Sequence, residues 1–534
     1  MTALVRLLRW LGAAALLGSI GVAVGAIAWQ AARGPVADQT LWPSPRLWGY
    51  FGRSLLIATI ACIVSLLIAL PALLAHVGGG RRFAAALCGL TLVPLFTLPS
   101  IHAYAWILLA TQDHGPVGPL LRWLGWMAPG FEPLQAAWAQ AMWLWPIPTL
   151  VLLAAWRREA AAAFELGLLD ASAGRAALRA ALPALRGPLV AALAAVFILS
   201  LQDGTIGPLM QARTWTAEMM ANALIASKYD RPAAYMAWAN WPLVATLATV
   251  FALALPGLRR MAGWLETEPN ASIGSRVPTA VVAMATLVIV LIVLVPPLAL
   301  AGELLAIHVE PHRALLAAWH TVLRQGAGTG IVALAVGLLS AIIASACIAA
   351  RCDRLGLRFA AAAAAGCVVL CAMLTPEMTG PALISTYVAI TDPAHWNLYD
   401  NTPWVWIAGL LARYAFLPVC VAVVATRRAA AAAEQAAVDG ATPLAALARV
   451  TLPRIAPSLA VAALAAACLA LTDVTTSVLV QTPGFFGGSL AVRVDQQMHF
   501  GRNAELTATS LLLLIPSVLT AGIVGGLGFR RRQE

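Results

Sequence analysis

Apolar runs of roughly 20 residues or more recur along the whole chain, and each is long enough to cross about 30 Å of hydrocarbon at 1.5 Å per residue. Of the 534 residues, 61% are hydrophobic and only 11% are charged, with a mean hydropathy of +0.83. A soluble domain of this size cannot bury so much apolar surface. Because Ala, Leu, Val and Gly dominate the runs and the alternating segments of a membrane barrel are absent, we predict an all-α polytopic membrane protein.

The apolar runs predict about twelve spans. They lie at residues 7–29, 52–77, 83–110, 136–155, 188–210, 232–258, 277–301, 315–350, 359–390, 403–426, 457–480 and 505–529. The eighth and ninth runs are long for one crossing, which predicts tilt, kinks or helical turns outside the lipid.

Arginine clusters predict the orientation, because basic residues in short loops stay on the cytoplasmic side. They occur in alternate loops: Arg6 and Arg9, Arg81 and Arg82, Arg157 and Arg158, Arg259 and Arg260, Arg351, Arg354 and Arg358, Arg427 and Arg428, and Arg530 to Arg532. Twelve crossings place every cluster on one face, with both termini in the cytoplasm. The net charge of +11 is therefore mainly a topology signal, and no basic soluble domain is present to bind nucleic acid.

The first span has two interpretations. Arg6 and Arg9 precede an apolar stretch, and Ala26-Ile27-Ala28 resembles a signal-peptide cleavage site. The length of the apolar run favours a retained membrane anchor. The eight cysteines show no CxxC spacing and lie mostly in spans, so we expect small buried hydrophobes and neither a disulfide framework nor a metal site.

An internal repeat divides the chain. Residues 156–209 match residues 426–479 at a constant offset of 270. The offset pairs Arg157-Arg158 with Arg427-Arg428, Pro148 with Pro418, Leu182-Pro183 with Leu452-Pro453, and Asp203 with Asp473. A fixed offset over so many residues indicates duplication. We predict two six-span domains, 1–265 and 266–534, arranged as a parallel repeat with a pathway between the halves.

The two longest cytoplasmic loops, 156–187 and 427–456, are the repeated ones. In the second, Glu434 to Pro453 reads EQAAVDGATPLAALARVTLP. We expect an Ala-rich helix that opens with Glu434 near its positive end, a break at Asp439-Gly440, and an amphipathic helix that stops at Pro453. A helix–turn–helix outside the bilayer in both halves is suited to docking one partner with two equivalent sockets, although it could also simply join two spans.

The spacing in this loop resembles the EAA signature of binding-protein-dependent ABC permeases: Glu-Ala-Ala, three residues, Gly, nine residues, an aliphatic residue, one residue, then Leu-Pro. The matching positions are Glu434, Ala436, Gly440, Val450, Leu452 and Pro453, with Gln435 in place of the middle Ala. In that family the first short helix of the loop is the coupling helix, which inserts into a groove of the cytoplasmic ATPase. The resemblance thus implicates residues 434–446, Asp439 included.

The first copy of the loop departs from the signature. Counting back from Leu182-Pro183 places Phe164 at the Glu position and Asp170 at the Gly position, with Glu165 displaced by one. We still expect residues 164–175 to dock the ATPase. The missing Gly puts the turn geometry in doubt, and unequal coupling of two ATPase copies is a consequence to test.

A further stretch, residues 471–501, resembles fused permeases of the ferric-iron importer type. It carries Asp473 in the span, then Pro483-Gly484, Leu490-Ala491-Val492-Arg493 and His499-Phe500-Gly501. The family usually has Glu where Asp473 stands. This resemblance implies ferric iron as substrate, with thiamine or aminoethylphosphonate as alternatives, and a periplasmic binding protein that delivers it. It implies no cofactor and no catalytic residues.

Asp203 and Asp473 lie at equivalent positions toward the outer ends of the fifth span of each half, where an ionisable group is costly. Two hypotheses stand: these carboxylates line or gate the pathway, or each lies close enough to the outer interface to be hydrated and merely caps a helix or pairs locally. The outer loops carry Asp113, His114, Asp392, His395, Tyr399 and Asp400. These groups could bind a hard metal but more readily suit docking of the periplasmic protein.

Two other function classes are weighed against a permease. A secondary transporter also uses twelve helices in parallel halves, but it predicts charges deep in several spans, whereas here the charges crowd into loops. An intramembrane enzyme requires a convergent His, Ser or metal-ligand set, and none is evident. No phosphate-binding GxxxxGK[ST] loop occurs, so two copies of a cytoplasmic ATPase are expected as partners. The chain itself is expected in the bacterial inner membrane.

Overall fold

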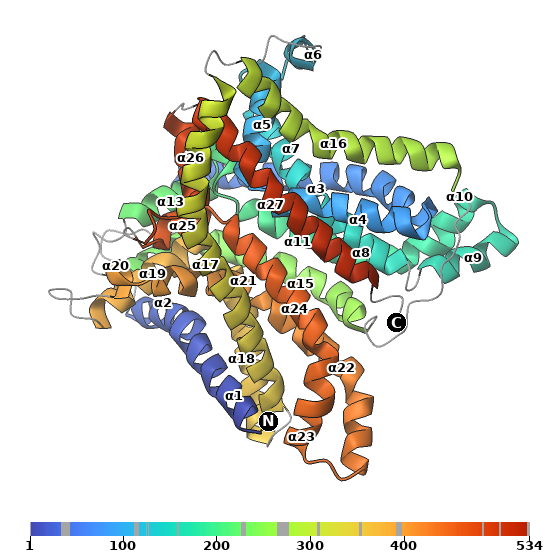
Figure 1. Ribbon diagram of the computed structural model, residues 1–534, viewed down its shortest axis with the longest axis vertical. Helices are drawn as coiled ribbons and strands as arrows, with labels where there is room; N and C mark the ends of the chain where they lie inside the picture. The colour runs from blue at the N-terminus through green and yellow to red at the C-terminus, as the bar shows by residue number, and fades with distance from the viewer. Residues whose placement is uncertain are drawn as a thin grey trace. The chain divides into compact units, whose positions relative to one another are not determined.

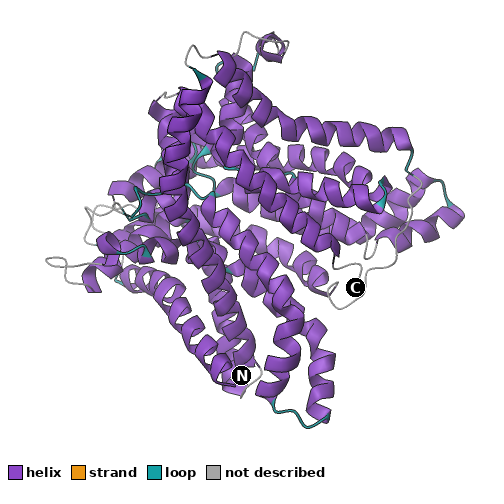
Figure 2. Cartoon of the chain, in the orientation of Figure 1, coloured by secondary structure: helices purple, strands orange, loops and turns teal. Residues whose placement is uncertain are grey.

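The structure is a computed structural model that describes residues 2–33, 43–111, 117–123, 125–126, 128–156, 160–225, 231–263, 277–306, 310–351, 355–390, 398–482, 485–500 and 503–530. All regular structure in these ranges is helical (Figure 2), which confirms the predicted all-α class.

Eight helices are long and apolar enough to cross a membrane, and four further pairs of helices qualify if each bent pair is one span. The total of up to twelve agrees with the predicted spans. The eight are Leu7–Ala32, Pro45–Gly78, Arg179–Leu201, Trp241–Met261, Thr279–Ala306, Pro311–Ala349, Leu447–Leu471 and Ala504–Gly525. The chain is therefore a polytopic membrane protein.

The bent pairs occupy the third and fourth positions of each predicted half. The third is bent by 91° between Arg82–Phe96 and Pro99–Thr111, and its counterpart by 112° between Ala361–Met373 and Pro376–Ile390. The fourth pairs are bent by 44° and 47°. Run 359–390, for which a kink was among the predicted features, is thus bent, and run 83–110, for which no kink was predicted, is bent as well. A proline that lacks a backbone N–H begins the second helix of both strongly bent pairs.

Helix packing divides the chain into two compact units (Figure 1). Unit 1 comprises Met1–Pro45, Glu218–Thr246 and Leu323–Arg493. Its helices are α1 (Thr2–Leu16), η1 (Leu17–Gly21), α2 (Val22–Ala32), α14 (Pro232–Ala239), α18 (Leu355–Met373), α19 (Pro376–Ile390), α20 (Leu398–Asn401), α21 (Trp404–Tyr414), α22 (Phe416–Val438), α23 (Pro443–Ala446), η5 (Leu447–Thr451), α24 (Leu452–Leu471) and α25 (Thr475–Val480).

Unit 2 comprises Arg46–Ala217, Leu247–Val322 and Val494–Glu534. Its helices are α3 (Pro45–Gly78), α4 (Arg81–Phe96), α5 (Pro99–Thr111), α6 (Val117–Trp123), α7 (Glu132–Leu144), α8 (Pro146–Ala155), α9 (Ala161–Asp170), α10 (Ala173–Ala176), η3 (Ala177–Ala181), α11 (Leu182–Leu201), α12 (Ile206–Leu209), α16 (Thr279–Ala306) and α27 (Asn503–Arg530). Four helices contribute to both units: α13 (Trp215–Ile225), α15 (Trp241–Gly263), α17 (Pro311–Arg351) and α26 (Leu490–Phe500).

The compact units exchange helices between the two sequence halves. Unit 1 takes α1 and α2 from the first half, and unit 2 takes α16 and α27 from the second. In unit 1, Gln30 of α2 accepts a hydrogen bond from the Ala233 N–H at 3.0 Å and donates one to Ser385 at 3.4 Å. The Tyr387 hydroxyl donates to the Gly18 carbonyl. The predicted boundary between the two domains at residue 265 is based on the sequence repeat and not on helix packing. It therefore stays a prediction.

Small residues allow the closest helix contact in unit 2. Gly257 of α15 lies against Gly187 of α11, and a Cβ built on Gly257 would stand 2.1 Å from the Gly187 carbonyl oxygen. Small side chains of this kind let membrane helices pack backbone to backbone. Along the same unit, α4 and α27 run beside each other (Figure 1).

Candidate functional site

The second repeated loop forms an exposed helical hairpin. Helix α22 continues out of its span and ends with Asp439 as its C-cap. The Gly440 N–H donates to the Ala437 carbonyl at 3.1 Å, and the Ala441 N–H donates to the Ala436 carbonyl at 2.9 Å. This is the Schellman pattern, and Gly440 adopts the positive φ of +84° that it requires. The glycine of the signature is thus explained by backbone geometry.

The chain then turns back through α23, η5 and α24. The Thr442 hydroxyl accepts a hydrogen bond from the Ala445 N–H at 3.3 Å and so caps α23. The expectation that the second helix stops at Pro453 is wrong, because Leu452-Pro453 opens α24 and the chain stays helical from η5 onward. Pro453 lies in the first turn of α24, where its missing N–H is tolerated best. The wider π turn of η5 precedes it.

Glu434 lies at the other end of its helix from the one we expected. Pro418 lies in the first turn of α22, where proline is tolerated, and neither Gly nor Pro occurs from Val419 to Val438. The span and the loop helix are therefore one continuous helix, and Glu434 stands close to its negative, C-terminal end. The side chains of Glu434 and Asp439 are exposed, and Val438 is 81% exposed. The tip of the hairpin therefore presents an apolar residue between two carboxylates.

The first repeated loop reaches a similar hairpin without glycine at its turn. Helix α9 ends at Asp170, and Ala171 follows in extended conformation at φ −148°. Within the described residues this turn contains no positive φ. Gly167 instead serves close packing, since a Cβ there would meet Ala176 and Ala180 at 3.1 and 3.2 Å. Arg157 and Arg158 lie outside the described residues.

The side chain that replaces the signature glutamate in this loop is anchored in unit 2. Phe164 packs against a buried cluster that includes Leu152 and Leu185, and its ring centroid lies 5.5 Å from that of Trp156. Glu165, Asp170 and Leu182 are exposed, and Pro183, half-buried, lies in the first turn of α11. Leu166 and Leu169, 66% and 80% exposed, form the apolar surface of this hairpin.

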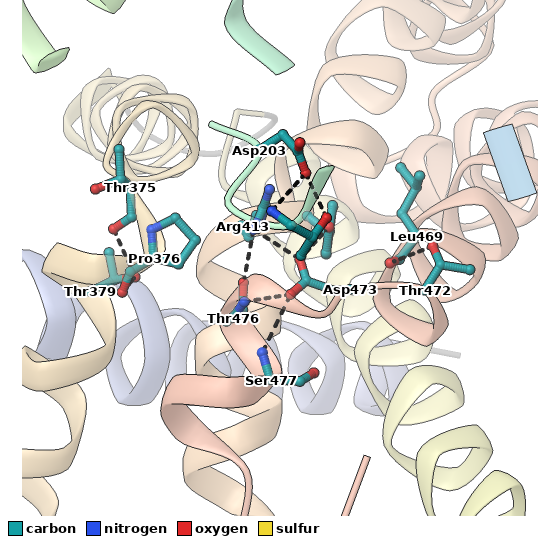
Figure 3. Close-up of polar contacts among 12 residues, drawn as sticks. Asp203, Thr375, Pro376, Thr379, Arg413, Leu469, Thr472, Asp473, Thr476 and Ser477 are labelled. Carbon is teal, nitrogen blue, oxygen red and sulfur yellow. Dashed lines mark hydrogen bonds and ion pairs between the residues drawn. The ribbon is translucent and has the colours of Figure 1, made fainter. Parts of the chain in front are cut away.

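Asp473 belongs to a buried ion pair in unit 1 (Figure 3). It accepts hydrogen bonds from the Thr476 N–H at 2.6 Å and from the Tyr414 hydroxyl at 2.5 Å. Arg413 Nη1 lies 3.0 Å from its Oδ2 and also donates to the Thr476 hydroxyl at 3.2 Å. The carboxylate thus caps α25 and fixes the bend between α21 and α22, as the helix-capping hypothesis requires.

Asp203 caps a helix in unit 2 without a countercharge in its hydrogen-bond set. It accepts from the Thr205 N–H and hydroxyl at 3.2 and 2.8 Å and from the Ile206 N–H at 3.1 Å, at the start of α12. Gln140 Nε2 of α7 donates to its Oδ2 at 3.1 Å. The Ser200 hydroxyl donates to Gln140 in turn. Both aspartates therefore have local structural partners, and a pathway role for them stays a prediction.

The structure adds three functional candidates that the sequence patterns did not single out: Arg413, Tyr414 and Glu377. Arg413 and Glu377 are charged residues inside long apolar runs, which is a signal that a search of the spans for ionisable residues would have detected. Glu377, in the first turn of α19, is fully buried, and neither carboxylate oxygen has a hydrogen-bond partner among the described residues.

The proposed outer-loop groups fall largely outside the described residues, namely Asp113, His114, Asp392 and His395, and so do Pro483, Gly484 and Gly501 of the C-terminal pattern. Tyr399 and Asp400 lie on the short helix α20. In the described part of the chain, no group of three or more His, Cys, Asp or Glu residues is placed to hold a metal ion.

Comparison with known proteins finds one kind of relative. The chain is 32% identical over 162 residues to the putrescine transport system permease protein PotI of Escherichia coli strain K12, and equally to PotI of E. coli O6:H1. The similarity covers 29% of this chain and 53% of each relative, so it spans about half the length of the relatives. No family model and no solved structure matches the chain. The chain is therefore a polytopic helical protein with similarity to a transport system permease protein.

Proposed function

We propose that this chain is the membrane-embedded permease of an ABC importer, with both permease halves in one polypeptide and ATP hydrolysis on a separate subunit. The observation that carries the proposal is the pair of exposed helical hairpins. The helices α10, η3 and α11 of the first hairpin each begin and end 270 residues before α23, η5 and α24 of the second. This correspondence supports the duplication, and the similarity to PotI supports the family.

The two hairpins are proposed to dock two copies of a cytoplasmic ATPase. In the second, Glu434, Asp439 and Gly440 are exposed at the tip and Ala436 is half-buried, with Leu452 and Pro453 at the return helix. In the first, Glu165 and Asp170 lie at the tip, and Leu182 and Pro183 at the return. Both hairpins present carboxylates beside exposed aliphatic side chains. Their different turns support unequal coupling of the two ATPase copies.

The proposal includes an inner-membrane location, both termini in the cytoplasm, and delivery of substrate by a periplasmic binding protein. Closure of the ATPase pair on ATP would draw the two hairpins together and rock the halves, in alternating access. The resemblance of residues 471–501 favours ferric iron, with thiamine and aminoethylphosphonate as alternatives. The name of the PotI relative adds a small organic dication, putrescine, to these candidates.

A secondary transporter is the second candidate, because one observation favours it. Glu377, Arg413 and Asp473 are charged side chains buried in or beside spans of unit 1, a feature of ion-coupled carriers. Uptake into proteoliposomes separates the two classes. A permease accumulates substrate only with the ATPase and ATP present, whereas a secondary transporter responds to an imposed ion gradient alone.

The coupling assignment is tested by Glu434→Ala combined with Gly440→Val. Valine is strained at φ +84°, so the Schellman turn is disrupted. The substitution of Glu434 by Ala removes one negative charge from the tip. We expect ATP hydrolysis to continue while substrate uptake is lost, with membrane insertion intact. Gln435→Ala, at an exposed neighbour, is the control. Undiminished uptake in the double variant contradicts the assignment.

A further inference from the structure

We propose that Glu377 is the charge-selecting residue of the translocation pathway and that it accepts the ammonium group of an organic cation. This inference rests on the proposed permease function and names the substrate class for it. It starts from the break between α18 and α19, where the chain bends by 112° and Thr375, Pro376 and Glu377 follow each other. Thr375 and Pro376 mark this break in Figure 3.

Glu377 and Thr375 have hydrogen-bonding capacity that the protein leaves unused. Both residues are fully buried, and Oε1 and Oε2 of Glu377 and Oγ1 of Thr375 lack hydrogen-bond partners in the described part of the chain. The Thr375 hydroxyl is near enough to influence the carboxylate, but the pair does not reach hydrogen-bond geometry. Buried polar atoms are normally paired, so oxygens without a protein partner are available to accept hydrogen bonds from a transported group.

The surroundings of Glu377 determine the charge of that ligand. Arg413 and Asp473 both interact electrostatically with Glu377, but Arg413 already forms an ion pair with Asp473 at 3.0 Å. The pair is neutral as a whole, so an ionised Glu377 gives these three described groups one net negative charge. A buried carboxylate without countercharge is strongly disfavoured, and an entering cation removes that cost.

The chemistry of the three oxygens favours an ammonium group over a metal ion. A primary ammonium has three N–H donors, which matches two carboxylate oxygens and one hydroxyl. Multivalent metal ions require more oxygen or nitrogen ligands, and no group of three or more acidic, His or Cys side chains is assembled within the described residues.

Unit 2 has the same break without the charge. Its proline, Pro99, is followed by Ser100, whose buried hydroxyl also lacks a partner among the described residues. At the 270-residue offset, Trp143 stands where unit 1 has Arg413. Charge selection is therefore assigned to unit 1 alone, and Ser100 provides a position-matched control.

The test is ATP-driven uptake by proteoliposomes that contain the full chain, its ATPase and its binding protein. The probes are putrescine as an organic dication, aminoethylphosphonate as a zwitterion and ferric iron as a metal. Glu377→Gln keeps the shape of a protonated carboxyl and removes only the charge. We expect Glu377→Gln to reduce putrescine uptake by about tenfold or more, because the interaction of the carboxylate with the ammonium group is lost. Glu377→Asp is expected to retain part of the uptake, and Ser100→Ala is expected to leave it unchanged.

A second measurement needs no variant. Putrescine is expected to protect Glu377 of the wild-type chain from modification by dicyclohexylcarbodiimide during ATP turnover, as detected by peptide mass spectrometry. Equal uptake by wild type and Glu377→Gln, absence of protection, or transport of only the zwitterion or iron overturns the inference and leaves the permease function standing. Absence of ATP-dependent uptake for all three probes and for thiamine overturns the permease function itself.

Discussion

At the residue scale, Asp203 and Asp473 are buried carboxylates that cap short helices with different partners. Both lie directly after a span and cap a short helix, α12 or α25. Asp473 also holds Arg413, whereas Asp203 relies on Gln140. An unpaired buried charge is far more costly than an unpaired neutral amide, so the same substitution has unequal consequences in the two units.

Asp473→Asn is therefore expected to destabilise the protein by about 3–5 kcal/mol, because Arg413 loses its countercharge while it stays largely buried. Asp203→Asn is the matched control, with an expected loss of about 1–3 kcal/mol from one mispaired buried hydrogen bond. Unfolding in mixed micelles measures both. Equal losses would show that the ion pair contributes nothing beyond helix capping.

Asp495 on α26 provides a prediction about pH. Burial raises the pKa of this carboxyl to about 6, His499 opposes the shift, and Asp203 reinforces it. An unfolded aspartate ionises near pH 4, so between about pH 4 and 6 the folded state retains a proton that the unfolded state has lost. This group therefore lowers stability as pH rises through that window, and the cost persists at pH 7.

Asp495→Asn removes that cost. The increase in Tm relative to the wild-type protein is expected to be larger at pH 7 than at pH 4, as measured by thermal unfolding in detergent at both values. Gln496→Asn, a substitution at an exposed position on the same helix, is the control and is expected to leave the pH dependence of Tm unchanged. An increase that is independent of pH contradicts the shifted pKa.

The sequence predicts the position of such residues better than their partners. The offset of 270 residues identifies Asp203 and Asp473 as equivalent, but it leaves open whether they are hydrated at the outer interface, and the structure buries both. The sequence does not reveal Tyr414 or Arg413 as partners, because residues some 60 positions apart meet only after the helices pack. It also places Glu434 at the wrong helix end, since nothing in a short window shows that α22 begins at Phe416.

At the element scale, apolar length predicts where the helices are but not where they break. Pro99 and Pro376 begin helices after sharp bends, whereas Pro71 and Pro296 lie inside helices that continue. A proline inside a helix removes one backbone hydrogen bond, whereas a proline at the first position removes none. Whether the chain bends at a proline therefore depends on how the neighbouring helices pack. That information is tertiary and is absent from any single apolar run.

The contact between α11 and α15 is expected to tolerate no added side chain. Gly257→Ala places a Cβ within 2.1 Å of the Gly187 carbonyl oxygen, so the helices must separate, at a cost of about 1–3 kcal/mol. Gly302→Ala in α16 is the matched control, since no atom lies within 4 Å of its Cβ position. Unfolding in mixed micelles is the measurement. A Gly257→Ala variant as stable as the control contradicts the close packing.

At the scale of the whole molecule, helix packing forms two compact units, and each takes helices from both predicted sequence halves. The helical class was predictable, because it follows from hydropathy and length. The exchange of α1, α2, α16 and α27 was not, since which apolar face meets which depends on side-chain fit rather than composition. The proposed function depends on a simpler property, namely two hairpins available to one kind of partner.

Photo-crosslinking from the two hairpin tips tests the central claim most directly. A photoreactive amino acid is placed at Val438 in one variant and at Leu169 in another, both strongly exposed aliphatic positions. Membranes are irradiated, the chain is purified, and its adducts are identified by mass spectrometry. The account predicts that both positions crosslink to the same P-loop ATPase from the cytoplasmic side. Crosslinks to no ATPase, or hairpins reached from opposite sides of the membrane, would contradict it.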